Sequence, residues 1–291
     1  MTAVANGPVE EMEERGRFID VGGLSTHYHD QGEGPVVVLI HGSGPGVTAH
    51  VNWQRVFPTM SHKFRVVALD MLGFGYTEVP EDVTYDVDAW VTHLTRFLDA
   101  LGIDRCSVVG NSYGGAIAMH LALRSPERVE RLVLMGSAGL TFDMTEGLQA
   151  AWGYQPSREN MRDLLYRFAH DPGLVNETLV ENRFQATLRP GVQEAFSAMF
   201  PEPRQEALDA LALDAEEVGR IDCEALVVHG RDDEVVPAAV SERIAELLPH
   251  SRLHVFPDCG HWVQIEKATE FEALVSSFLG ATESVETASR P

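Results

Sequence analysis

Short apolar runs alternate with amphipathic stretches along most of the chain. Runs of β-branched and aliphatic residues predict buried strands at residues 36–40, 65–69, 106–109, 131–135, 226–228 and 253–256. Apolar residues recur at helical spacing between them, which predicts helices at residues 87–101, 116–123, 239–248 and 271–279. Strands that are apolar on both faces suit a parallel sheet covered by helices on each side. The alternation therefore predicts an α/β fold with a doubly wound sheet.

One region interrupts this alternation. Residues 141–204 contain no strand pattern, and amphipathic helical patterns run there between Gly and Pro breaks. We therefore expect a helical cap at 141–204, inserted into an α/β core made of residues 17–140 and 205–280. Residues 1–16 and 281–291 show no apolar periodicity and are expected to be a flexible leader and tail.

Composition narrows the class of protein. The 291 residues are 44% hydrophobic and 23% charged, as in globular domains, and the net charge is −22. So negative a chain is not expected to bind nucleic acid or an anionic membrane, since both require a basic surface. No apolar run has the length of a membrane span. Three cysteines make no disulfide framework, so a reducing cytoplasm is the expected location.

The segment from Val108 to Gly115 carries the clearest chemical signal. It places Gly110-Asn111-Ser112-Tyr113-Gly114, a Gly-x-Ser-x-Gly pattern, between a predicted strand and a predicted helix. This arrangement is typical of a nucleophile elbow, in which the serine occupies a sharp, strained turn. Glycines on either side allow the backbones to approach closely. Ser112 is the predicted nucleophile.

An oxyanion hole requires two backbone N–H donors beside the nucleophile. Tyr113, the residue after Ser112, is expected to supply one of them. The loop that follows the strand at 36–40 begins His41-Gly42-Ser43, and Ser43 is the predicted second donor. Gly42 brings its backbone to the same site and is expected to contact the substrate. His41 is expected to fix this loop rather than act as a base.

An acid and a base should follow the serine in that order. Asp232 and Asp233 follow the strand at 226–228, and His261 follows the last strand. The carboxyl ends of parallel strands share one edge of a sheet, so these loops can meet there. His261 is the predicted base and Asp233, in the pattern Gly-x-x-Asp, the predicted acid, while Asp232 remains the alternative. Cys259 is expected to be a small buried residue because the elbow already holds a serine.

Metal and cofactor chemistry receive little support from the sequence. His27-Tyr28-His29 looks like an alternating strand rather than a ligand set. No Gly-x-Gly-x-x-Gly follows a strand, and there is no phosphate-binding loop. We therefore expect neither a metal nor a cofactor.

The combined motifs resemble one family. The chain is similar to the meta-cleavage product hydrolases at five motifs. These are His-Gly-Ser-Gly-Pro-Gly at residues 41–46, Asn-Trp at 52–53, Gly-Asn-Ser-Tyr-Gly-Gly at 110–115, Gly-Arg-Asp-Asp at 230–233 and Cys-Gly-His-Trp at 259–262. The likeness runs from about residue 18 to residue 279. Thr-Glu-Gly-Leu at 145–148 and Phe-Pro-Glu-Pro-Arg at 200–204 resemble the branch that acts on monocyclic ring-fission products.

The resemblance implies a reaction and an assembly. It implies an α/β-hydrolase fold that cleaves a C–C bond of a 2-hydroxy-6-oxohexa-2,4-dienoate, such as 2-hydroxymuconic semialdehyde or a 6-alkyl analogue. The products would be 2-hydroxypenta-2,4-dienoate and formate or a carboxylic acid, in bacterial aromatic catabolism. The family also implies a homo-oligomer. Whether Ser112 forms an acyl-enzyme or only assists water stays open.

Five further residues match binding positions of this family. Asn52 and Asn111 would contact the dienoate, and local turn bonding is the alternative for both. Arg183 would meet the substrate's carboxylate or 2-oxo group; otherwise it would pair with nearby cap glutamates. Trp262 and Phe168 would line the non-polar pocket, or simply pack in the core.

Two other functions remain as alternatives. A carboxylesterase or thioesterase would use the same triad on an ester, and a ligand receptor could keep the fold without turnover. Epoxide hydrolases and dehalogenases place an aspartate at the elbow, so Ser112 argues against both.

Overall fold

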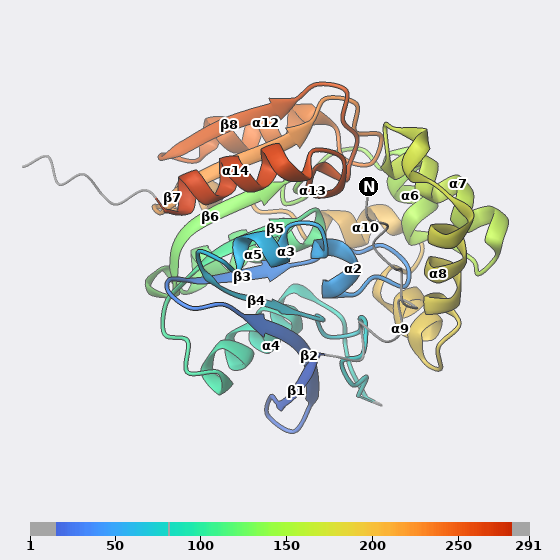
Figure 1. The fold of residues 1–291 in the computed structure, drawn as a ribbon, viewed down its shortest axis with the longest axis horizontal. Helices are drawn as coiled ribbons and strands as arrows, with labels where there is room; N and C mark the ends of the chain where they lie inside the picture. The colour runs from blue at the N-terminus through green and yellow to red at the C-terminus, as the bar shows by residue number, and fades with distance from the viewer. Residues whose placement is uncertain (1–15, 81, 281–291) are drawn as a thin grey trace, which may run out of the picture.

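A computed structural model describes residues 16–80 and 82–280, and most of the predicted leader and the predicted tail, at residues 1–15 and 281–291, lie outside the described residues. The strands are β1 (Arg17–Asp20), β2 (Ser25–Gln31), β3 (Val36–Ile40), β4 (Arg65–Leu69), β5 (Cys106–Asn111), β6 (Val129–Met135), β7 (Glu224–Gly230) and β8 (Ser251–Phe256). They form one 8-stranded sheet in the order β1-β2-β4-β3-β5-β6-β7-β8 (Figure 1). Pairing from β4 to β8 is parallel, whereas β1–β2 and β2–β4 are antiparallel.

Helices cover both faces of this sheet. The helices are α2 (Ala49–Trp53), α3 (Phe57–Met60), α4 (Val87–Ala100), α5 (Tyr113–Arg124), α6 (Glu146–Trp152), α7 (Arg158–Phe168), α8 (Glu177–Thr187), α9 (Val192–Met199), α10 (Arg204–Asp209), α11 (Ala215–Gly219), α12 (Ala238–Leu247), α13 (Val263–Glu266) and α14 (Ala268–Leu279), with 3₁₀ turns η1 (Pro126–Arg128) and η2 (Pro172–Leu174). Alternate side chains of β3 enter two cores, because successive residues of a strand point to opposite faces. Val38 and Ile40 pack with α4 and α5, while Val37 and Leu39 pack with α2, α3 and α14.

The chain between β6 and β7 is helical, and no residue there is in a strand. Helices α6 to α9 gather at one end of the sheet, at the right of Figure 1. Helical structure continues beyond residue 204, as α10 and α11, before β7 begins at Glu224. None of the helices in the described part of the chain is long and apolar enough to cross a membrane.

The six predicted apolar strands all match strands of the sheet, whereas β1 was not predicted and β2 was anticipated only at His27-Tyr28-His29, as an alternating strand. Ser25–Gln31 reads STHYHDQ, so it lacks the apolar run that marks the central strands. Two of its buried polar side chains are instead paired: Thr26 contacts His93 at 2.9 Å, and His27 Nδ1 lies 2.9 Å from the Asp70 carboxylate. Tertiary partners make this polar strand possible, and those partners are far away in the sequence.

Candidate active site

Ser112 occupies the sharp turn between β5 and α5. Its backbone has φ 55° and ψ −119°, a conformation that L-residues rarely adopt. The flanking glycines are sterically required: a Cβ on Gly110 would lie 2.3 Å from the carbonyl oxygen of Gly114, and a Cβ on Gly114 would lie 2.5 Å from that of Ile40. The strand–turn–helix context predicted for the Gly-x-Ser-x-Gly segment is present.

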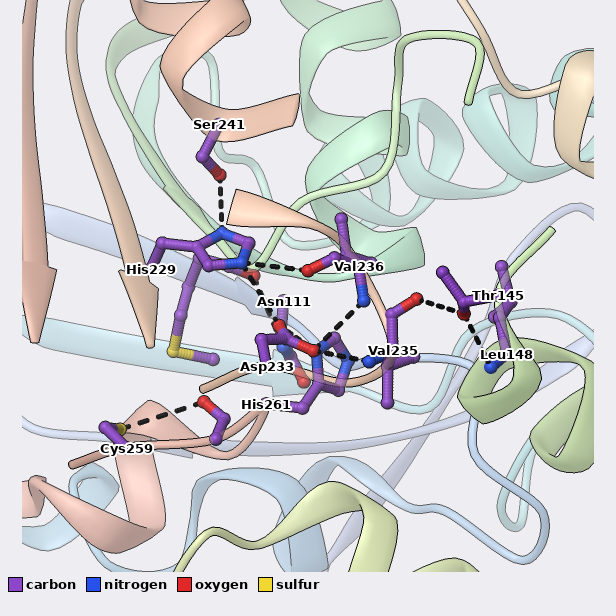
Figure 2. Close-up of polar contacts among 12 residues, drawn as sticks. Asn111, Thr145, Leu148, His229, Asp233, Val235, Val236, Ser241, Cys259 and His261 are labelled. Atoms are coloured by element: carbon purple, nitrogen blue, oxygen red, sulfur yellow. Dashed lines mark hydrogen bonds and ion pairs between the residues drawn. The ribbon is translucent and has the colours of Figure 1, made fainter. Parts of the chain in front are cut away.

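His261 and Asp233 form a buried pair at the carboxyl ends of β7 and β8. His261 Nδ1 donates to Asp233 Oδ2 at 2.7 Å, and the carboxylate side chain is fully buried (Figure 2). Asp233 Oδ1 also accepts from the backbone N–H groups of Val235 and Val236, at 2.7 and 3.0 Å. These bonds orient the carboxylate. Because His261 Nδ1 donates to that carboxylate, the other ring nitrogen, Nε2, is the one that can accept a proton in catalysis.

The environment of Asp233 keeps it ionised. Burial alone would raise the pKa of this carboxyl, but the charge and hydrogen bond of His261 outweigh that effect, so its pKa lies below the ordinary value. His229 lies beneath the pair, with Nε2 3.0 Å from the carbonyl of Val236 and Nδ1 2.7 Å from the Ser241 hydroxyl. His229 therefore braces the acid loop. The sequence analysis did not identify this role of His229.

Asp232 and Cys259 lie beside this pair without joining it. Asp232 is exposed, and its carboxylate accepts from the backbone N–H of Cys259 at 3.2 Å. The Cys259 side chain is buried, and burial raises the pKa of its thiol to about 12. Asp232 thus braces the loop that carries His261, and the Cys259 thiol remains protonated at neutral pH.

Ser112 and His261 line the same pocket, and both are buried. Within residues 16–80 and 82–280, however, no hydrogen bond joins the Ser112 hydroxyl to the His261 ring. Catalytic hydrogen bonds in ligand-free sites are often long and tighten when substrate binds. Rotation about the Cα–Cβ bond of Ser112 is the motion that would bring its hydroxyl towards Nε2.

The loop after β3 is held by His41. The buried His41 ring accepts from the backbone N–H of Met71 at Nε2, at 3.0 Å, and Nδ1 donates to the Gly42 carbonyl, at 2.7 Å. Burial lowers the pKa of His41, so the ring stays neutral as this pattern requires. In a planar trans peptide the Ser43 N–H points opposite to the Gly42 carbonyl. Fixing that carbonyl therefore fixes the direction of the predicted donor.

The other predicted donor is at the start of a helix. Tyr113 is the first residue of α5, where a backbone N–H has no acceptor within the helix. On the opposite side, the Ser43 hydroxyl accepts from Trp152 Nε1 at 2.9 Å. Trp152 belongs to α6 and stacks on Phe200, with ring centroids 4.3 Å apart. The sequence pointed to neither this contact nor Trp152.

Two buried amides form the wall next to the serine. Asn52 Oδ1 accepts from the Gly42 N–H at 3.4 Å, and Asn111 Nδ2 donates to the Met135 carbonyl at 3.3 Å. Gln264, which sequence reasoning missed, donates to the Asn52 carbonyl at 3.2 Å. Asn52 Nδ2 and Gln264 Oε1 are buried with no hydrogen-bond partner in the described chain. A donor and an acceptor are thus available to a polar ligand.

Arg183 comes from α8 and is almost completely buried at the pocket. One guanidinium nitrogen donates to the Pro45 carbonyl at 2.9 Å. Of the cap glutamates expected as its alternative partners, the nearby Glu181 is paired with Arg158. Phe168 packs against Trp262 with ring centroids 5.3 Å apart, and its carbonyl accepts from the His261 backbone N–H at 2.9 Å. Both aromatic residues line the pocket.

The predicted site residues converge on one pocket. Gly42, Ser43, Asn52, Asn111, Ser112, Phe168, Arg183, His261 and Trp262 all line it. Asp233 lies behind His261, and Tyr113 lies beneath the elbow. In the described part of the chain one group of side chains could hold a metal ion, His170 with Asp232 and Asp258, and all three are exposed and outside the pocket.

Comparison with known proteins places this site in a family. The family model for the alpha/beta hydrolase fold matches residues 35–268. The chain is 52% identical over 268 residues to a 2-hydroxy-6-oxo-2,4-heptadienoate hydrolase of Pseudomonas putida strain F1, covering 92% of this chain and 97% of that protein. It is 51% identical over 279 residues to a 2-hydroxymuconate semialdehyde hydrolase of Pseudomonas sp. strain CF600, covering 96% and 97%.

A solved structure has the same fold. It is a meta-cleavage product hydrolase from Pseudomonas fluorescens IP01, a serine-to-alanine mutant complexed with acetates, and it superposes with a TM-score of 0.90 at 51% identity, over 91% of this chain and 97% of that one. The elbow, the His–Asp pair and these likenesses agree, and the chain belongs to the α/β-hydrolase family and, within it, to the meta-cleavage product hydrolases.

Proposed function

We propose that this protein hydrolyses the C5–C6 bond of 2-hydroxy-6-oxohexa-2,4-dienoates, using Ser112, His261 and Asp233 as its triad. One observation carries the proposal: the serine elbow and the buried His–Asp pair open into a pocket that also holds a buried arginine, Arg183. A dienoate has an electrophilic carbonyl at one end and a carboxylate at the other. Such a substrate needs both features of the pocket.

The first stage converts the dienol into a ketone. The 2-hydroxyl loses its proton while C5 gains one, and His261 is the group placed to relay it. The new C2 carbonyl, conjugated through C3 and C4, becomes an electron sink for the bond to be broken. Arg183 and the free amide groups of Asn52 and Gln264 hold the dienoate end in this stage.

The second stage adds an oxygen nucleophile to the C6 carbonyl. The nucleophile is Ser112 or a water that Ser112 helps activate, and His261 takes its proton. The resulting oxyanion would bond the N–H groups of Ser43 and Tyr113, each worth about 2.7–4 kcal/mol. The C5–C6 bond then breaks, its electrons pass to the C2 oxygen, and proton return gives 2-hydroxypenta-2,4-dienoate. Formate or a carboxylic acid leaves from C6 after net addition of one water.

Helices α6 to α9 serve as the cap over this chemistry, within the predicted segment 141–204. Phe168, Trp152 and Arg183 all come from these helices and reach the core. We also propose a homo-oligomer, as the family resemblance implies, and a cytoplasmic location, which suits three unpaired cysteines. Sedimentation and cell fractionation test these two points.

Turnover of a matched substrate pair tests the function. The yellow ring-fission product of catechol and p-nitrophenyl acetate are compared by kcat/KM at one pH. We expect the dienoate to be preferred by about a hundredfold or more, because only it can use the buried cation and the amides. A preference for the ester would establish an esterase instead. A panel with hydrogen, methyl, isopropyl and phenyl at C6 then defines the pocket's size limit.

A further inference from the structure

The charged side chains that line the pocket are opposite in sign to the net charge of the chain. The sequence has 44 acidic and 22 basic residues. Among the described residues, however, no Asp or Glu lines the pocket, whereas two arginines do, Arg55 and Arg183. Arg183 is the buried cation already described. Arg55 has no role in the reaction as proposed, and nothing in the sequence motifs points to it.

Arg55 lies at the mouth of the pocket. It follows Gln54, the C-cap of α2, and both side chains are exposed. The residues around the serine are buried, whereas Leu174 and Ile265 are only partly so and form an apolar rim. An anion that enters therefore passes the cation at the rim before it reaches Arg183.

The positive charge of Arg55 is not neutralised locally. Within residues 16–80 and 82–280, no carboxylate lies within ion-pair distance of Arg55, and its side chain makes no hydrogen bond there. Several other exposed or half-exposed arginines of this acidic chain are paired, as Arg65 is with Asp30 at 2.9 Å and Arg158 with Glu181 at 2.6 Å. Arg96 resembles Arg55 in having no such partner among the described residues, but it lies away from the pocket. An unpaired cation next to a low-dielectric cleft attracts anions against the repulsion of the rest of the surface.

We propose that Arg55 is a specificity determinant that captures the carboxylate of anionic substrates at the pocket mouth and delivers it towards Arg183. That the anion is a dienoate rests on the proposed function. That Arg55 favours anionic over neutral substrates does not. The contact is exposed and belongs to the encounter, so it accelerates binding and is weakened by salt. The chemical step takes place after the carboxylate has moved inward.

Arg55→Gln and Arg55→Glu test the proposal against a matched control, Arg96→Gln. Arg96 is also exposed, lies on α4 and does not line the pocket. For the dienoate at low ionic strength we expect Arg55→Gln to lower kcat/KM about threefold to tenfold, and Arg55→Glu to lower it further. The value of kcat should change less than twofold. Rising ionic strength should lower kcat/KM of the unmodified enzyme more steeply than kcat/KM of Arg55→Gln. The two kcat/KM values should therefore converge at high salt.

A pair of esters makes the test independent of the C–C bond reaction. p-Nitrophenyl butyrate is neutral, and mono-p-nitrophenyl succinate carries a carboxylate on a similar acyl chain. We expect Arg55→Gln to lower kcat/KM for the anionic ester only. Equal losses on both esters, an equal effect of Arg96→Gln, or no effect of Arg55→Glu would each overturn the proposal. Failure of dienoate turnover in the unmodified enzyme would instead overturn the proposed function, and the ester comparison would still decide the role of Arg55.

Discussion

The pocket has two walls that are built in different ways. The core wall comes from loops at the ends of β3, β5, β7 and β8, and backbone contacts define it: the elbow glycines touch neighbouring carbonyls and the Asp233 carboxylate is held by peptide N–H groups. The helical wall comes from α6 to α8 and meets the core through contacts such as Trp152 to Ser43 and Arg183 to Pro45. The core wall can hold reacting groups to a fraction of an ångström, whereas the helical wall can vary in shape.

This difference separates chemistry from recognition. The groups proposed to move protons or form bonds all lie on the core wall, and the proposed carboxylate ligand, Arg183, lies on the helical wall. Changes to the triad or to the oxyanion-hole donors of the core wall should therefore reduce the rate on every substrate. Changes in the helical wall should act mainly on anionic substrates.

The largest effect is expected at the core wall from Ser112→Ala and His261→Ala. Each should lower kcat by about a thousandfold or more, since triad residues act as a unit. Turnover of the dienoate and of p-nitrophenyl acetate should fall together, as measured by steady-state absorbance, with thermal unfolding as the check on folding. Retention of ester hydrolysis in Ser112→Ala would show that another group is the nucleophile.

The next largest effect distinguishes two adjacent carboxylates. Asp233→Asn should lower kcat by about a hundredfold or more, because His261 loses the charge and the acceptor that fix its tautomer. Asp232→Asn is the matched control and should cost less than about tenfold, as this side chain only braces a loop. A larger loss at Asp232 would reverse the assignment of the acid.

On the helical wall, Arg183→Gln should lower kcat/KM for the dienoate about tenfold to a hundredfold. Hydrolysis of p-nitrophenyl acetate should change less than threefold, since that ester has no carboxylate to bind. Arg183→Lys keeps the charge but loses the planar fork and should recover part of the loss. Equal losses on both substrates would mean that Arg183 supports the fold rather than the ligand.

The smallest effect is expected from thiol alkylation. Burial raises the pKa to about 12 for Cys106 and Cys259 and to about 11 for Cys223, so little thiolate exists at pH 8. Iodoacetamide at that pH should leave dienoate turnover within about twofold over an hour, with mass spectrometry to count the adducts. Rapid loss of activity matched by an adduct on Cys259 would contradict the protonated thiol beside His261.

The sequence predicted the core wall well because its signals are local. An apolar strand, a Gly-x-Ser-x-Gly turn and a helix pattern follow each other within about twenty residues, and the structure joins them as expected, with β3 and β4 matching the predicted bounds. The polar strand β2 was anticipated only at His27-Tyr28-His29, because its stability depends on distant partners such as Asp70 and His93. Arg183 and Trp262 were found only through the family resemblance, since a single arginine or tryptophan in a helical pattern carries no local signal.

By itself the sequence determined the fold class and predicted the candidate nucleophile and the order of the candidate acid and base, because strand patterns and tight turns are encoded by neighbouring residues. Only the tertiary structure decided that Asp233 rather than Asp232 meets His261, since two adjacent side chains differ in direction and not in chemistry. It alone brought Arg55 and Gln264 to the same pocket as Ser112, and Trp152 to the Ser43 hydroxyl. Residues so far apart in the chain are joined by packing of the helical segment on the sheet, and that packing has no short-range pattern.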